Sequence, residues 1–493
     1  MKSNSIIKIN FRGGIISPGG LLKILEAAQQ ALIGKVSFGS RQQLLIQVTD
    51  RQSDLLTHLL DGLDVSYERN ADDFPNVVSS YPAEEIFITK TWLTEGVYKD
   101  VFDLMDFTPR LKINLSNSNQ SFTPILTGNI NWVASPHSPH FWHLFIRFPK
   151  TNKVYEWNQL VYTNDISRLS KLVEAFIFAN KKEYYDNPEA DGNVLFENIP
   201  WQSLITQKAD SQANLPTFNL PYYEGLNRYN DKYWLGIYRR NELFDIAFLK
   251  DICRLCLETK VGQLCATSWK SILVKGIEEK YRSFWNAVLA FHRINVRHAA
   301  NELNFQVEDH CSRGLALKNY LVQKLSRDDM RTFGICIGIK TRKKSEVFSS
   351  ILVRERHLFT VFGRGLFSVY DILCAKDFNP NERTGEMFCT NTPKFLLPGK
   401  FRKAIRLFFH QQATQQDKVR VLPHPREEQA QGPPQWVYQC KHCLTIYDPS
   451  ETLTGIDEQG SLPVDHSCSL CEAPAAEFQR LEKAAITGEE PLG

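Results

Sequence analysis

Two cysteine pairs near the C-terminal end of the chain have the spacing of metal ligands. They are Cys440 with Cys443 and Cys468 with Cys471, and 24 residues separate the two pairs. A gap of two residues lets both thiolates of a pair point at one metal from a tight turn, and two such turns facing each other complete a tetrahedral four-sulfur site. Because the rest of the chain has the character of a protein from a reducing compartment, a disulfide framework is not expected. The sequence therefore predicts a bound metal.

The spacing alone leaves the metal open, since tetrahedral sulfur accepts zinc or iron. The residues around the pairs closely resemble rubredoxin, a family that holds one iron on four cysteinates and transfers single electrons. Besides the cysteines, the matching residues are Tyr438, Tyr447, Asp448, Pro449, Gly455, Ile456, Leu462, Pro463, Asp465, Leu470 and Phe478. The resemblance implies a small rubredoxin-like domain over residues 436–485 with one iron that cycles between Fe3+ and Fe2+. A structural zinc site is the alternative.

The chain departs from the rubredoxin pattern at three positions. Leu444 and Glu472 stand where the family usually carries a glycine after each cysteine pair, and His466 stands where it usually has tryptophan. In the family those glycines let backbone N–H groups approach the cysteine sulfurs, and such hydrogen bonds tune the reduction potential. The resemblance does not fix the potential of this chain.

Length and composition bound the remainder of the protein. A chain of 493 residues with 43% hydrophobic and 12% aromatic residues holds several packed domains. We expect a cytoplasmic location without a membrane span, because the sequence shows no signal-peptide pattern and no apolar run of spanning length. We also expect no nucleic-acid partner, since the basic run from Lys340 to Lys344 is typical of a solvated loop.

The small net charge of +3 hides an asymmetry along the chain. Residues 436–493 contain ten acidic and three basic side chains, so the rest of the chain carries a net charge of +10. An acidic redox domain joined to a basic body suggests electrostatic docking to a partner or to its own chain. Two independently soluble surfaces would give the same pattern.

An internal repeat determines the predicted fold of the body. Shifting the sequence by 228 positions, without a gap, aligns several identical residues and a matching apolar pattern across residues 12–76. Each copy has alternating strands and helices, and each is followed by a longer β-rich stretch that ends in a helix. The identical pairs include Gly34 and Gly262, Ser40 and Ser268, Arg69 and Arg297, Ala71 and Ala299, and Asn76 and Asn304.

The first copy resembles the ferredoxin-like half domain of sirohaem-dependent sulfite and nitrite reductases. The resemblance rests on Gly14, Ser17 and Leu21, on the run from Val36 to Ile46, and on Asn76-Val77-Val78. It implies an α+β fold with duplicated ferredoxin-like half domains and two larger α+β lobes. The predicted segments are residues 1–84 (first half domain), 85–225 (first lobe and connection), 226–306 (second half domain), 307–410 (second lobe) and 411–435 (linker).

The same resemblance implies an anion pocket. By position, Arg41 would face the sirohaem and its anionic substrate, and Arg110 and Lys112 would stand where the family places two lysines around the bound anion. Cationic groups there would suit carboxylates and an oxyanion such as nitrite. Each residue could instead be an ordinary solvated surface charge.

The iron–sulfur ligands of that family are missing. The reductases need four cysteines, as Cys-x5-Cys and Cys-x3-Cys, whereas Leu317 stands at the second ligand position after Cys311. Cys336 has no cysteine three or four residues away, and Trp269 replaces the basic residue of the second copy. We therefore expect no 4Fe-4S cluster and no sirohaem, and we interpret the body as a degenerate reductase scaffold, since the missing cluster cysteines favour a role other than catalysis.

Three functional hypotheses follow. The favoured one is an electron-transfer protein that serves a nitrate or nitrite (or sulfite) reductase system, with a separate electron donor and a redox partner protein. In the second, the body is a sirohaem-binding reductase-like enzyme supplied by its own rubredoxin-like domain. In the third, the protein is a non-redox scaffold that carries zinc.

Overall fold

The computed structural model divides by its internal contacts into two compact units, Met1–Gln412 and Ala413–Gly493. We refer to the first unit as the body and to the second as the C-terminal unit. Among the described residues, none of the helices combines the length and apolar character that a membrane-spanning segment requires. The structure describes residues 4–88, 91–213, 215–342, 347–361, 364–382, 385–421, 436–443, 445–447, 462–463, 466–468 and 471–482.

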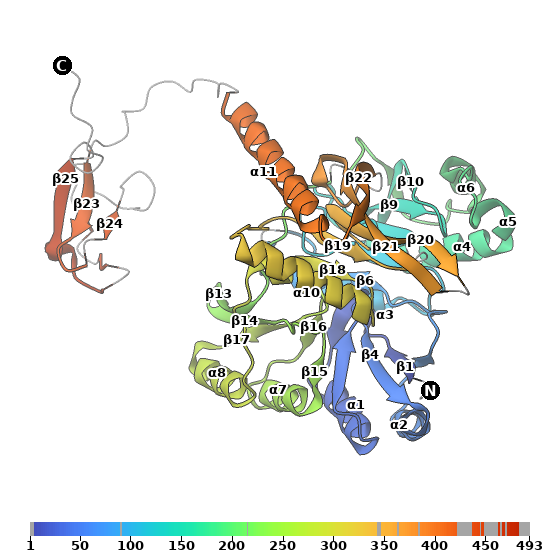
Figure 1. Ribbon diagram of the computed structural model, residues 1–493, viewed down its shortest axis with the longest axis horizontal. Helices are drawn as coiled ribbons and strands as arrows, with labels where there is room; N and C mark the ends of the chain where they lie inside the picture. Colours follow the sequence, from blue (N-terminus) through green and yellow to red (C-terminus); the bar gives the residue numbers. More distant parts are fainter. Residues whose placement is uncertain are drawn as a thin grey trace. The chain divides into compact units, whose positions relative to one another are not determined.

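The predicted repeat is present in the body as two similar half domains (Figure 1). Their main elements follow each other at the same offset of 228 positions that the sequence showed. The matched pairs are β1 (Asn4–Ile9) with β14 (Lys232–Ile237), α1 (Pro18–Gln30) with α7 (Ile246–Glu258), β3 (Lys35–Phe38) with β16 (Leu264–Ala266), β4 (Leu44–Thr49) with β17 (Ile272–Ile277), and α2 (Asp50–Gly62) with α8 (Arg282–Phe291).

Each half domain completes its sheet with a short strand from the other copy. Strand β15 (Phe244–Asp245) of the second copy pairs with β3, and β2 (Ile15–Ile16) of the first copy pairs with β16. The resulting sheet orders are β15-β3-β4-β1-β5 and β13-β14-β17-β16-β2, with β5 at Glu68–Arg69 and β13 at Gly225–Tyr229. The two half domains therefore share one apolar core.

Local sequence explains how the helices of the first copy begin. The Ser17 side chain accepts a hydrogen bond from the backbone N–H of Gly20, and Pro18 takes the first position of α1, where a missing N–H costs nothing. Helix α2 begins with a capping box in which the Gln52 side chain accepts the backbone N–H of Thr49. Apolar residues of α1 at helical spacing, among them Leu21 and Leu25, face the shared core.

The first lobe is a seven-stranded sheet, ordered β12-β11-β9-β8-β7-β6, with β10 also paired to β9. Strands β6, β7 and β8 are parallel, and β8, β9 and β11 are antiparallel. The elements are β6 (Val78–Ser79), α3 (Glu95–Asp103), β7 (Ile113–Ser116), β8 (Ile130–Ala134), β9 (Phe141–Arg147), β10 (Val154–Glu156), β11 (Gln159–Tyr162), α4 (Ile166–Ala179), α5 (Lys181–Tyr184), α6 (Gly192–Asn198) and β12 (Thr206–Lys208).

The second lobe repeats the same scheme with fewer strands. Its sheet order is β18-β19-β20-β21-β22, in which the first three strands are parallel and the last three antiparallel. The elements are α9 (Ala300–Leu303), β18 (Phe305–Val307), α10 (Ser312–Arg327), β19 (Ile337–Lys340), β20 (Ile351–Val361), β21 (Arg364–Ala375), β22 (Gly385–Pro393) and α11 (Leu397–Val421). The α+β class with two half domains and two larger lobes is thus the observed fold of the body.

Two parts of the body have more regular structure than a connection or a linker would. Within the segment predicted as first lobe and connection, residues 181–225 contain α5, α6 and β12, and β12 adds an edge strand to the first lobe by pairing with β11. Helix α11 continues to Val421 and so takes in the first residues of the predicted linker, 411–435. Residues 422–435 lie outside the described residues.

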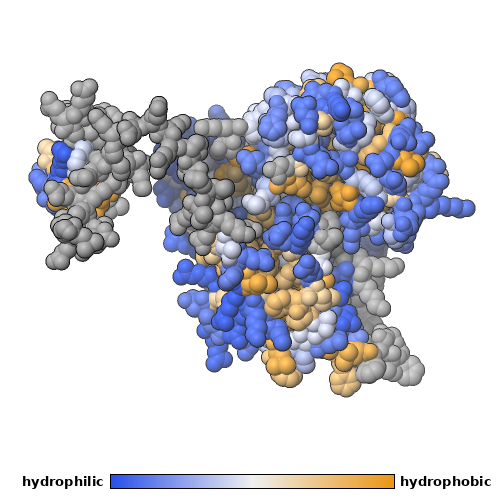
Figure 2. Space-filling view, turned by 90° about the horizontal axis from the view of Figure 1, so that it is seen from above, coloured by the Kyte–Doolittle hydropathy of each residue, from blue (hydrophilic) through white to orange (hydrophobic). Residues whose placement is uncertain are grey.

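The described surface carries both polar and apolar regions. On the face seen in Figure 2, hydrophobic residues gather in patches between hydrophilic ones. The most exposed large hydrophobic side chains include Leu32, Phe291 and Phe395.

Beyond the last residues of α11, the C-terminal unit forms a small three-stranded antiparallel sheet in the order β24-β23-β25. The central strand is β23 (Trp436–Cys440), with β24 (Ile446–Tyr447) on one side and β25 (Phe478–Glu482) on the other. A sheet of this size buries little apolar surface, so a bound metal would contribute much of its stability.

Candidate metal centre

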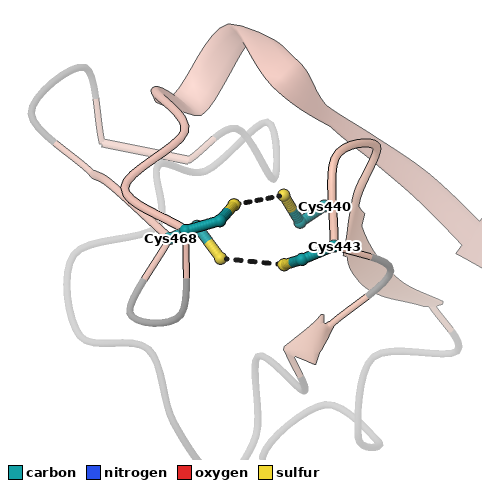
Figure 3. Close-up of side chains that lie close together, drawn as sticks. Cys440, Cys443 and Cys468 are labelled. Carbon is teal, nitrogen blue, oxygen red and sulfur yellow. Dashed lines mark hydrogen bonds between the residues drawn. The ribbon is translucent and has the colours of Figure 1, made fainter.

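The four predicted cysteine ligands converge in the C-terminal unit. The Sγ atoms of Cys440 and Cys471 are 3.5 Å apart, those of Cys443 and Cys468 are 3.4 Å apart, and all four lie within 4.8 Å of one another. Figure 3 shows the side chains of Cys440, Cys443 and Cys468 pointing toward a common centre. Among the described residues, this is the only cluster of three or more histidine, cysteine or acidic side chains able to hold a metal ion.

Two similar turns position the sulfurs. In the first turn the backbone N–H of Cys440 donates to the carbonyl of Thr445, and in the second the N–H of Cys468 donates to the carbonyl of Ala473, both at 2.9 Å. Each bond therefore joins a cysteine to the residue five positions later. Cys440 and Cys468 are buried, Cys443 is half-buried, and Cys471 is exposed.

The second turn keeps a glycine-like conformation without a glycine. Glu472, at one of the positions where the rubredoxin pattern has glycine, adopts a φ of 60°, in the left-handed region that side chains disfavour. Its backbone N–H donates to the carbonyl of Cys468 at 2.8 Å, which holds the turn closed. The corresponding residue of the first turn, Leu444, lies outside the described residues.

Three aromatic rings pack together near the cysteines. Tyr447, His466 and Phe478 form a triangle with ring centroids 5.2–5.5 Å apart. His466 thus takes the place expected for the tryptophan of the rubredoxin pattern. Tyr447 is buried, and Leu462 and Phe478 pack against the same cluster. Six of the residues that match the rubredoxin pattern, Asp448, Pro449, Gly455, Ile456, Asp465 and Leu470, lie outside the described residues.

Hydrogen bonds to Cys443 favour the thiolate form that a metal requires. The Thr445 hydroxyl lies 3.0 Å from the Sγ of Cys443, and the Tyr447 hydroxyl donates to the Sγ of Cys468 at 3.3 Å. Side-chain and backbone hydrogen bonds from Thr445 lower the pKa of the Cys443 thiol. Four sulfur donors with this spacing fit a tetrahedral site for iron or zinc.

The predicted anion-pocket residues line two adjoining cavities in the body. Arg41 and Lys112 share a cavity of about 550 Å³. Arg110 and Lys112 line a wider one of about 1520 Å³. Lys112 therefore shares one cavity with Arg41 and the other cavity with Arg110, whereas Arg41 and Arg110 do not line the same cavity.

The guanidinium of Arg41 is held by the protein. It donates to the carbonyl of Asn76 at 2.7 and 3.1 Å and to the carbonyl of Ile113 at 3.1 Å, so it joins the first half domain to the first lobe. Arg110 stacks on the ring of Phe178, with its Cζ atom 4.3 Å from the ring centroid. Both side chains have structural contacts in addition to their position at a cavity.

Sequence reasoning missed Asp309, an acidic residue that lines both cavities. Its carboxylate accepts the backbone N–H of Ser40 and forms an ion pair with Lys270 at 3.2 Å, and thereby links the two copies of the repeat. Lys270 also pairs with Glu242 at 2.7 Å. The alignment of the two copies could have pointed to such a residue. Lys270 stands at the position of Gln42, and a lysine at a buried position requires a carboxylate partner.

The cysteines of the body do not converge. Cys311 contacts the hydroxyl of Thr341, whereas the thiol of Cys336 donates to the carbonyl of Phe348. Cys253, Cys256 and Cys265 are buried in the apolar cores. The cavity walls offer cationic, amide and carboxylate groups, with no thiol among the described residues that line them. This donor set does not fit a cysteine-ligated iron–sulfur cluster.

Comparison with known proteins supports the fold assignment. The chain matches no protein-family model and no curated protein sequence. A solved structure described as "Structure of Mycobacterium tuberculosis NirA protein" aligns with a TM-score of 0.62, covering 82% of this chain and 80% of that chain. The two sequences are 12% identical over the alignment, so the likeness is one of fold.

Proposed function

We propose that the protein is a one-electron carrier that holds a single iron on Cys440, Cys443, Cys468 and Cys471. The observation that carries the proposal is the convergence of the four sulfurs within 4.8 Å. The rubredoxin-like sequence around them favours iron over zinc. When bound, iron would supply reversible one-electron chemistry.

The chain's own residues suit such a role. Four thiolates hold the site with little room for ligand movement, which keeps the structural change on electron transfer small. Tyr447 and Phe478 pack in the same cluster as the buried Cys440 and Cys468, so apolar rings lie beside these two cysteines. The exposed Cys471 brings one sulfur to the surface of the unit, where an electron can pass to or from a partner.

The partner we propose is a component of a nitrate or nitrite (or sulfite) reductase system in the cytoplasm, with a separate protein as electron donor. Two observations support it: the body shares its fold with NirA, and its first half domain resembles sirohaem-dependent reductases in sequence. The body then serves as a docking scaffold, because its cysteines are dispersed.

The deciding experiment is metal analysis and a visible spectrum of protein produced in iron-sufficient medium. We expect one iron per chain and cysteinate-to-iron charge-transfer bands that bleach on reduction. One zinc per chain without colour would refute the redox function and leave the zinc-bearing scaffold. Tetrapyrrole absorption would instead support the reductase-like enzyme.

Replacing one ligand tests the site directly. Cys443→Ser should lower the iron content and abolish one-electron cycling, because the harder serine oxygen is a poorer ligand for this site than a thiolate. Its matched control is Cys389→Ser, which changes a half-buried cysteine of the body and should leave iron and colour unchanged. Full iron occupancy with normal cycling in Cys443→Ser would show that the ligand assignment is wrong.

A further inference from the structure

The two turns of the metal centre differ in the hydrogen bonds that their sulfurs can receive. Thr445 follows Cys443 by two positions, and Ala473 follows Cys471 by two positions. Both residues occupy the same place in their turn, since each supplies the carbonyl that accepts the first cysteine's N–H. The first turn therefore has a hydroxyl where the second has a methyl group.

Strand geometry aims two hydroxyls at the sulfurs. Thr445 and Tyr447 flank Ile446, whose side chain is exposed, so the alternation of an extended strand turns the two hydroxyl-bearing side chains toward the opposite, metal-binding face. Thr445 reaches the Sγ of Cys443 and Tyr447 reaches the Sγ of Cys468. Those two sulfurs are themselves neighbours, 3.4 Å apart.

A metal-bound thiolate has no proton, so each hydroxyl must be the donor in these contacts. Donation to sulfur withdraws electron density from it, and the effect stabilises whichever state of the site carries more negative charge. In a four-thiolate iron site that is the reduced state. The hydroxyls therefore favour reduction.

We propose that Thr445 is a positioning residue that raises the reduction potential of the metal centre by donating its hydroxyl proton to Cys443, with Tyr447 acting in the same way on Cys468. The inference rests on the proposed function, since it concerns the same iron site. It assigns the asymmetry between the two turns to a single side chain.

The test compares midpoint potentials of the full-length protein, measured by dye-mediated titration against an electrode. Thr445→Val removes the hydroxyl but keeps the branched shape. It should lower the equilibrium constant for reduction by up to tenfold, which lowers the midpoint potential by up to about 59 mV for one electron. Thr445→Ser keeps the hydroxyl and should retain the wild-type potential. Ala473→Ser adds a hydroxyl to the second turn and should raise it.

Two results would overturn the proposal. One is an unchanged potential in Thr445→Val, and the other is an equal shift in Thr445→Val and Thr445→Ser. If Thr445→Val fails to hold metal, Ala473→Ser still decides, because an unchanged potential there contradicts the role of the hydroxyl.

A second readout separates this inference from the proposed function. A wild-type protein without iron bands refutes the carrier, whatever the variants do. In the cobalt(II)-substituted protein, thiolate-to-metal charge transfer should move to lower energy in Thr445→Val and stay in place in Thr445→Ser. Iron bands with normal cycling but no difference among the variants would refute the role of Thr445 alone.

Discussion

The two copies of the repeat have equivalent hairpins that share a backbone conformation but carry side chains of different chemistry. In the first copy the turn is Ser40-Arg41-Gln42, and in the second it is Ser268-Trp269-Lys270. The third residue adopts a left-handed backbone in both, with a φ of 62° at Gln42 and 56° at Lys270. Duplication has kept the conformation while the side chains diverged.

The divergence changes what each hairpin contacts. Arg41 lies at the edge of a cavity and holds two carbonyls of the neighbouring segments. Trp269 is buried and donates its indole N–H to the carbonyl of Phe122 at 2.6 Å. The first copy thus has a charged side chain beside a cavity, whereas the second copy has a buried aromatic side chain at the equivalent position. A shared backbone is therefore a poor guide to shared function.

The strongest test of this difference replaces the middle residue of each hairpin turn, Arg41 or Trp269, by alanine. Trp269→Ala should lower the free energy of unfolding of the body by about 3–5 kcal/mol, because it empties a large buried site and leaves the Phe122 carbonyl without its donor. The matched variant Arg41→Ala should cost only about 1–2 kcal/mol, since its guanidinium is partly exposed. Urea unfolding followed by circular dichroism measures both. Equal losses would mean that the two hairpins are equivalent after all.

The third position tests the buried charge. Lys270→Met leaves the carboxylates of Glu242 and Asp309 without their cation, and breaking such a buried pair should cost about 3 kcal/mol. The double variant Lys270→Met/Glu242→Gln should recover part of that loss, because it removes one of the two orphaned charges. Thermal unfolding at neutral pH would rank the stabilities of the wild type, the single variant and the double variant. No recovery in the double variant would place the cost elsewhere.

The second copy also shapes the pH dependence of stability. Lys275 of β17 donates to the carbonyls of Tyr81 and Glu84, whereas the equivalent residue of the first copy, Gln47, is exposed. Burial raises the pKa of the Glu84 carboxyl to about 7, against 4.5 ordinarily, and the charge of Lys275 opposes part of this rise. The unfolded chain therefore releases this proton first, so stability should fall by about 2–3 kcal/mol as the pH rises from about 4.5 to about 7.

Glu84→Gln isolates that contribution. The amide still accepts the hydroxyl proton of Tyr98, which bonds Glu84 at 2.8 Å, but it does not ionise. The variant should flatten the stability profile over this pH range and be more stable than the wild type at pH 8. A profile with the same slope as the wild type would assign the pH dependence to other groups.

The sequence predicted most of the fold and the metal ligands for a definite physical reason. Repeats and Cys-x-x-Cys pairs are patterns of spacing along the chain, so they can be recognised directly from the sequence. The partners of Arg41 and Lys270 could not be predicted, because they come from segments far away in the chain. The short strands β2 and β15 were missed for a related reason, since two residues give no detectable alternation and their pairing depends on the other copy.

The crossed pairing of β2 and β15 means that neither half domain is a self-contained folding unit. A fragment that contained one copy alone would expose an unpaired edge next to β3 or β16, and such an edge invites association with another chain. The chain that carries both copies closes both sheets within one molecule, so neither edge depends on association with a second chain.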